Sequence, residues 1–195
     1  MTENYNKNIA EEAEETLSMD PKKFILWLFI VSSVMFFASQ TSAYLVKRAE
    51  GNWAEFEVPQ IFWYGTAVII LSSITMQFAV FSAKKDNFNA LKTAISITFV
   101  LGLVFLYLQV QGWKDLVAQN VYFVGNASGS FFYAFTVFHG VHILLGLLVL
   151  GITFSSSLQM KVHAKALRRI EICTTFWHFL GVVWIYLFAF LLYFR

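Results

Sequence analysis

Three histidines lie inside long apolar runs in the C-terminal half of the chain, and they are the side chains best placed to do chemistry. His139 and His142 belong to the run from Phe138 to Gly146, and His178 belongs to the run from Trp177 to Trp184. Burial of an imidazole in hydrocarbon is costly unless it gains a hydrogen-bond partner, a metal or a functional role. The nature of these histidines therefore decides how the chain is interpreted.

The spacing allows three interpretations. A haem could be held by His142 and His178 from two helices, although their depths differ by about 7 Å at the rise of a helix. A zinc ion finds less support, because no cysteine or carboxylate lies at a matching depth. The favoured interpretation is neutral imidazoles that hydrogen-bond across helices. The hydroxyls expected as their partners are those of Ser130, Thr136, Thr174 and Thr175.

The composition is typical of a polytopic membrane protein. Hydrophobic residues make up 58% of the chain and charged residues only 13%, against about a quarter charged in a soluble domain. The single cysteine, Cys173, excludes an intrachain disulfide and a cysteine-based metal site. The net charge of +2 and the lack of a basic cluster give no indication of nucleic-acid binding.

Five segments are long and apolar enough to cross a bilayer, which takes about 20 residues of helix. We predict an all-α fold, a membrane bundle of five transmembrane helices formed by residues 21–195. The predicted spans cover residues 24–46, 61–83, 93–112, 131–154 and 172–194. Residues 1–20 are acidic and do not resemble a signal peptide. We expect them to form a mobile cytoplasmic tail, with a short surface helix as the alternative.

The loop charges predict the orientation of the bundle. Most lysines and arginines fall on the side that carries Lys22, Lys23, Lys84 and Lys85. The positive-inside rule therefore places the N-terminus in the cytoplasm and the C-terminus in the periplasm.

Apart from the three histidines, the spans contain no ionisable side chain of the Asp, Glu, Lys or Arg type. An ion-coupled transporter needs such groups at depth, so this class finds little support. Gln40, Gln77 and Gln109 lie within the spans or toward their ends, where we expect them to hydrogen-bond between helices.

Several short motifs match a known family in both order and spacing. They comprise Gly129–Phe132, Phe138–His142 with Gly146, Glu171 with Phe176–Phe179, and Val182–Trp184. In these residues the chain resembles subunit III of the haem–copper respiratory oxidases, in its five-span bacterial form. The resemblance extends from about Pro21 to Arg195.

The resemblance implies a supporting role in an oxidase. Subunit III of that family carries no haem or copper; those groups belong to subunits I and II. It packs against subunit I, binds phospholipid and supports proton uptake. We therefore expect a non-catalytic subunit of a cytochrome c oxidase in a bacterial cytoplasmic membrane. The alternatives are a quinol oxidase subunit or a b-type cytochrome with its own haem. The residues implied in packing, lipid or subunit contacts are His139, His142, Gly146, Glu171, Trp177, His178 and Trp184.

The chain departs from the family pattern at three positions. Ser33 stands where a carbodiimide-reactive glutamate is usual, Gly112 replaces a second glutamate, and Gly181 replaces an aspartate. The chain also lacks the first two helices of the seven-span members, which open a lipid-filled cleft. A partner subunit or lipid is expected to cover that face.

Overall fold

The computed structural model describes residues 21–51, 53–158 and 164–194, and each of these segments is helical or a connection between helices. The helices are α2 (Pro21–Ala49), α3 (Ile61–Lys84), α4 (Phe88–Ala118), α5 (Ala127–Leu158) and α6 (Ala164–Tyr193). All five are long and apolar enough to span a membrane, which confirms the predicted all-α fold with five membrane-length helices. The acidic tail predicted for residues 1–20 lies outside the described residues.

The helices extend beyond the apolar segments at most of their ends, because backbone hydrogen bonding continues into polar residues. α4 starts five residues before its predicted span, where Asn87 caps it by accepting a hydrogen bond from the backbone N–H of Ala90 at 3.2 Å. The side chain of Asn126 acts in the same way before α5, accepting from the backbone N–H of Ser128 at 2.9 Å. Such caps satisfy N–H groups that lack a partner in the first helical turn.

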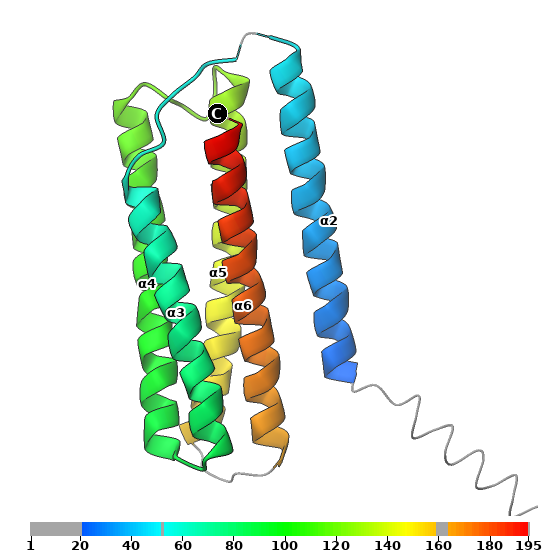
Figure 1. The fold of residues 1–195 in the computed structure, drawn as a ribbon, viewed down its shortest axis with the longest axis vertical. Coiled ribbons are helices and arrows are strands. Elements are labelled where there is room, and N and C mark those ends of the chain that lie inside the picture. Colours follow the sequence, from blue (N-terminus) through cyan, green and yellow to red (C-terminus); the bar gives the residue numbers. More distant parts are fainter. Residues whose placement is uncertain (1–20, 52, 159–163, 195) are drawn as a thin grey trace, which may run out of the picture.

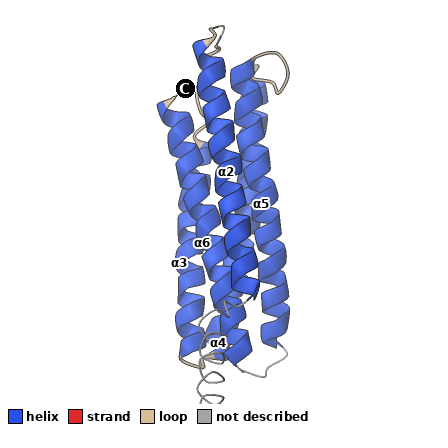
Figure 2. Ribbon diagram, turned by 90° about the vertical axis from the view of Figure 1, so that its right-hand side faces the viewer, coloured by secondary structure: helices blue, strands red, loops and turns tan. Residues whose placement is uncertain are grey.

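The helices alternate in direction and form a bundle (Figure 1). α3 and α4 make an antiparallel pair joined by a tight turn, in which Asp86 adopts a left-handed backbone conformation with φ 55°. α6 packs against α3 and α5, and α4 packs against α5. Among the described helices α2 packs only on α5 and α6, and it stands at the side of the bundle (Figures 1 and 2).

α6 is the central helix of the bundle. In its most apolar window 56% of the residues are buried, against 22% in α2. Lipid is as apolar as the side chains, so close packing and hydrogen bonds hold such helices together. The bundle core is accordingly aromatic, and its largest fully buried side chains include Trp177, Trp184, Phe62, Phe105, Phe132 and Phe135.

Candidate functional site

His142 joins α5 to α2. Its Nδ1 lies 2.7 Å from the carbonyl oxygen of Phe138, one turn earlier on the same helix. A carbonyl can only accept, so Nδ1 carries the proton and Nε2 is the acceptor. Nε2 lies 3.3 Å from Oγ of Ser33, whose single proton is shared between this nitrogen and the carbonyl oxygen of Phe29, 2.8 Å from the same Oγ. Ser33, which stands where the family usually has a glutamate, thus contacts His142 through its hydroxyl group.

His139 lies one turn away in a different environment. It is 0% exposed, and its ring packs against Phe37, Phe105 and Trp184 with centroid separations of 6.4, 5.8 and 5.1 Å. Neither ring nitrogen has a hydrogen-bond partner among the described residues. His139 is therefore enclosed by aromatic rings from α2, α4 and α6.

His178 faces α3 rather than α2. Its Nε2 lies 3.2 Å from Oε1 of Gln77, which confirms the expected interhelical bond for that glutamine. The same histidine lines two cavities, one of about 460 Å³ between α3 and α6 and one of about 420 Å³ that also borders α2. Glu171, two turns earlier on α6, lines the second cavity.

Trp177 is the side chain on which four helices meet. It is 1% exposed and donates from Nε1 to the hydroxyl of Ser72 on α3 at 3.1 Å. Two glycines make room for its ring. A Cβ placed on Gly102 of α4 would lie 2.8 Å from Trp177 Cη2, and one on Gly146 of α5 would lie 3.3 Å from Cζ3. Gly146 therefore permits the close packing of α5 on α6.

Trp184 makes a similar connection two turns further along α6. Its Nε1 donates to the hydroxyl of Thr66 on α3 at 3.0 Å. Its ring packs edge-on against Phe105 of α4 at 5.0 Å and near His139 of α5. The two motif tryptophans thus place α6 against α3, α4 and α5.

The seven residues singled out in the sequence do not form one site. His139 lies beside Trp184, Gly146 beside Trp177, and Glu171 and His178 line one cavity, whereas His142 lies on the α2 side. In the part of the chain that the structure describes, no three His, Cys, Asp or Glu side chains are grouped to hold a metal.

The geometry also bears on the proposed haem pair. Nε2 of His142 lies beside Ser33 of α2 and Nε2 of His178 beside Gln77 of α3, so the two nitrogens contact different helices. What the arrangement provides is neutral hydrogen bonds and aromatic packing between helices.

The prediction that four hydroxyl side chains hydrogen-bond to the histidines was wrong. Thr136, Thr174 and Thr175 donate to the carbonyl oxygens four residues earlier, and Ser130 donates to Phe123 and Asn126. Back-bonding of this kind is the usual behaviour of hydroxyls within apolar helices. For Gln40 and Gln109 the expected interhelical bond is absent at Oε1, which has no partner among the described residues.

The residues that sequence reasoning missed are small or hydroxyl side chains. Ser72, Thr66 and Gly102 position the two tryptophans, and Ser33 contacts His142. For Ser72, Thr66 and Gly102 the only signal in the sequence is a small or polar residue inside an apolar span, which does not identify the partner helix. Ser33 was singled out as a departure from the family pattern, but not as the partner of His142.

The glycines at two of the departures from the family pattern have different surroundings. A Cβ on Gly112 would lie 2.5 Å from Cζ of Phe62, so that ring fills the space where a longer side chain would begin. A Cβ on Gly181 would face the hydroxyl of Ser73 at 3.2 Å, on the wall of the larger cavity between α3 and α6.

Comparisons with known proteins agree with the motifs. A sequence model of the family described as cytochrome c oxidase subunit III matches residues 5–195. A probable cytochrome c oxidase subunit 3 from Nocardia farcinica is 33% identical over 175 residues, covering 85% of this chain and 83% of the relative. A cytochrome c oxidase subunit 3 from Bacillus sp. (strain PS3) is 27% identical, covering 92% and 89%. A cytochrome bo(3) ubiquinol oxidase subunit 3 from Buchnera aphidicola is 28% identical, covering 94% and 91%.

Proposed function

The chain belongs to the cytochrome c oxidase subunit III family, and we propose that it is the non-catalytic subunit that supports the oxygen-reducing subunit of its complex. It is the subunit III of a terminal oxidase and a multi-pass protein of the bacterial inner membrane. The proposal concerns what this subunit does there: it stabilises subunit I, binds phospholipid and supports proton uptake, and it carries no haem or copper of its own.

One observation carries the non-catalytic assignment. The three histidines have their nearest polar or aromatic contacts on three different helices. His139 contacts Trp184 of α6, His142 contacts Ser33 of α2, and His178 contacts Gln77 of α3. Histidines that act as redox-centre ligands converge on one point. These three instead contribute to the contacts between helices.

The partners follow from the family and from the surface. Direct packing on subunit I, with subunit II in the same complex, is the arrangement that the resemblance implies. α2 offers an extended apolar surface for such contacts or for lipid, because Phe24, Ile25, Trp27, Val34 and Met35 are all exposed.

Cytochrome c is the electron donor that we propose, with quinol as the alternative. The similarity supports both, since the chain matches subunits named for cytochrome c oxidase and for ubiquinol oxidase over most of their length. The donor site would lie on other subunits, so this chain does not select between them.

The orientation remains as the loop charges predict it. The start of α2, the end of α3 and the start of α6 share one end of the bundle (Figure 1). Lys22, Lys23 and Lys84 lie there, so we assign this end to the cytoplasm.

The test is an optical one. The chain is tagged, its complex is purified in mild detergent, and a reduced-minus-oxidised spectrum is recorded. Haem a bands would support a cytochrome c oxidase, and b-type bands alone would favour a quinol oxidase. An intact preparation without haem would overturn the oxidase assignment.

A second step tests the absence of haem in this chain. After the partner subunits are stripped away, the isolated chain should show no b-type band. A band that persists and is lost in His178→Ala would establish the b-type cytochrome instead.

A further inference from the structure

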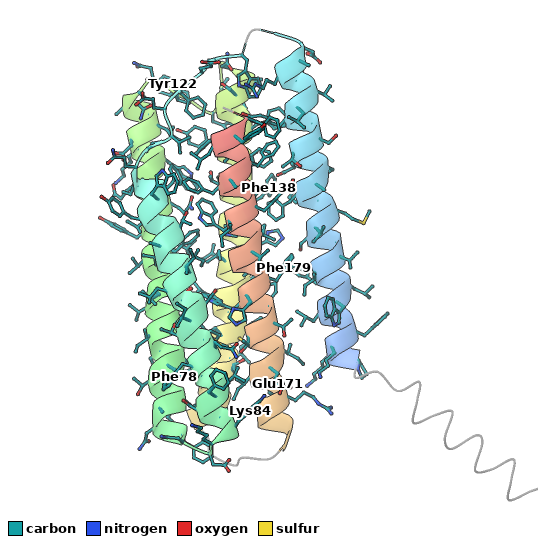
Figure 3. The ribbon with its side chains drawn as sticks, viewed as in Figure 1. Phe78, Lys84, Tyr122, Phe138, Glu171 and Phe179 are labelled. Atoms are coloured by element: carbon teal, nitrogen blue, oxygen red, sulfur yellow. The ribbon has the colours of Figure 1, made fainter. Side chains whose placement is uncertain are left out.

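The end of the bundle at which α2, α4 and α6 begin carries a strong excess of positive charge. Among the described side chains there, two are acidic, Asp86 and Glu171, and seven are basic. Figure 3 shows Lys84 and Glu171 at this end of the bundle. The basic residues are Lys22, Lys23, Lys84, Lys85, Lys92, Arg168 and Arg169. This end is therefore a surface for an anionic partner.

The turn between α3 and α4 holds two of these lysines at the surface. Lys84 and Lys85 are both exposed, and neither forms an ion pair with another described residue. The backbone N–H of Asn87 donates to the carbonyl oxygen of Ser82 at 3.0 Å, which fixes the course of the turn. Asp86 lies between the lysines and α4 and offsets one of the two positive charges. The turn therefore keeps a net positive charge on a well-defined backbone.

Residues 1–20, which lie outside the described residues, have the opposite charge. They hold six acidic residues and one lysine, which gives a net charge of −5. Four of the acids fall within residues 11–15, the sequence Glu-Glu-Ala-Glu-Glu, which we call the acidic run. In a helix Glu11 and Glu15 would be like charges one turn apart, and such charges repel each other. A basic surface beside the acidic run would relieve this repulsion.

The acidic run is attached close to the basic end. Glu15 stands six residues before Pro21, where α2 begins, and an extended chain of that length reaches about 20 Å. α2 packs on α6 and α6 packs on α3, so the axes of α2 and α3 are about two packing distances apart, or roughly 20 Å. Lys23 of α2 and Lys84 of α3 also line one cavity. The acidic run can therefore reach the α3–α4 turn.

We propose that the acidic run binds Lys84 and Lys85 of the α3–α4 turn, as an electrostatic contact within the chain. The tether holds the acidic run at an effective concentration in the millimolar range, so weak ion pairs are enough to keep it bound. The competing partner is an anionic lipid surface, which also attracts lysines. The acidic run is favoured because it cannot diffuse away and because its charge complements that of the turn.

The experiment uses the purified oxidase complex that contains the full chain, placed in bilayer discs that hold phosphatidylglycerol. Spin labels are attached at Ala13→Cys in the acidic run and at Asn89→Cys, an exposed position at the start of α4. The parent chain, whose Cys173 is buried, is the labelling control. Double electron–electron resonance should show a narrow population at short distance. This population should be lost at about 1 M salt, because the Debye length falls to about 3 Å.

Charge variants test which residues make the contact. Lys84→Gln with Lys85→Gln should reduce the ratio of bound to free acidic run by about 2- to 25-fold, at about 1.4- to 5-fold for each exposed ion pair. Lys114→Gln is the control, since Lys114 is exposed near the other end of α4, and it should change nothing. Lys84→Glu with Lys85→Glu should abolish binding. Replacement of the four glutamates of the acidic run by lysine should restore it in that background only.

Three outcomes would overturn the proposal. The first is the lack of a short-distance population in the unmutated charge background, as expected if the acidic run binds another subunit. The second is a short-distance population that the lysine variants or salt leave unchanged. The third is a population that forms in phosphatidylcholine discs and is lost with phosphatidylglycerol, which would assign the lysines to lipid headgroups. Haem content and the yield of the complex, recorded for every variant, confirm that assembled samples are compared.

Discussion

Gly102→Ala should loosen the packing between α4 and α6. Gly102 lies in the middle of α4, where an added Cβ would come 2.8 Å from both Cη2 of Trp177 and Cδ2 of Leu147. The end of the leucine can rotate away. The indole cannot easily do so, because it is 1% exposed and its Nε1 is hydrogen-bonded to Ser72.

Two opposing terms set the size of the effect. Overpacking of a tightly packed core costs about 1–3 kcal/mol. Replacement of glycine by alanine inside a helix contributes up to about 1 kcal/mol in the other direction. With the full helix gain, the net loss in the free energy of unfolding is therefore up to about 2 kcal/mol. For a chain of this length that is a fall in melting temperature of up to roughly 8 °C.

The measurement is thermal unfolding of the purified complex, followed as loss of the intact complex on size-exclusion chromatography. Gly140→Ala is the matched control, since its Cβ would meet nothing closer than Leu106 Cδ2 at 3.9 Å. The control should be neutral or slightly stabilising. If Gly102→Ala were as stable as this control, Trp177 would not be held as the structure shows, and the reasoning would be refuted.

The remaining predictions concern the histidines and the missing carboxylates. His142→Ala and His178→Ala should lower the yield of the complex, while turnover per assembled enzyme stays normal. The reason is that each variant removes an interhelical hydrogen bond worth about 0.6–1.7 kcal/mol. A normal yield of complex that has lost haem would contradict this. His139→Phe should leave the yield of the complex unchanged or higher, because it removes the free-energy cost of burying a polar ring without a hydrogen-bond partner. A large loss of the chain on immunoblots of membranes would show a polar role for the His139 ring. Dicyclohexylcarbodiimide should not label the first or third span, because Ser33 and Gly112 offer no carboxylate; a labelled peptide from either span would refute this.

The five helices could be predicted from the sequence, but their ends could not. Hydropathy locates the part of a helix that lies in hydrocarbon, whereas the helix itself ends where backbone groups find caps. α4 shows the difference, because it runs from Phe88 to Ala118 while the apolar segment covers only 93–112. The cap at Asn87 depends on a side-chain hydrogen bond that hydropathy does not report.

The candidate site could be predicted as a set of residues but not as a geometry. The motifs identified His142 and His178, yet their partners Ser33 and Gln77 are 109 and 101 positions away in the chain. Helical periodicity predicts which residues share a face. It does not predict which other helix that face meets, so the order of the helices around the bundle had to come from the structure.

α2 shows why the loss of a family carboxylate need not detach a helix. Its buried residues, Ile30, Ser33, Phe37, Thr41 and Tyr44, recur every three or four positions and form one narrow stripe. Along it Ser33 meets His142, Thr41 meets the hydroxyl of Tyr186 at 3.0 Å, and Tyr44 donates to the carbonyl of Phe194 at 2.9 Å. Neutral bonds of this kind average about 0.6 kcal/mol each within membranes, so three of them contribute only about 2 kcal/mol. The exposed remainder of α2 must then be stabilised by whatever lies against it in the membrane, which makes this helix the one whose position depends most on the partners of the chain.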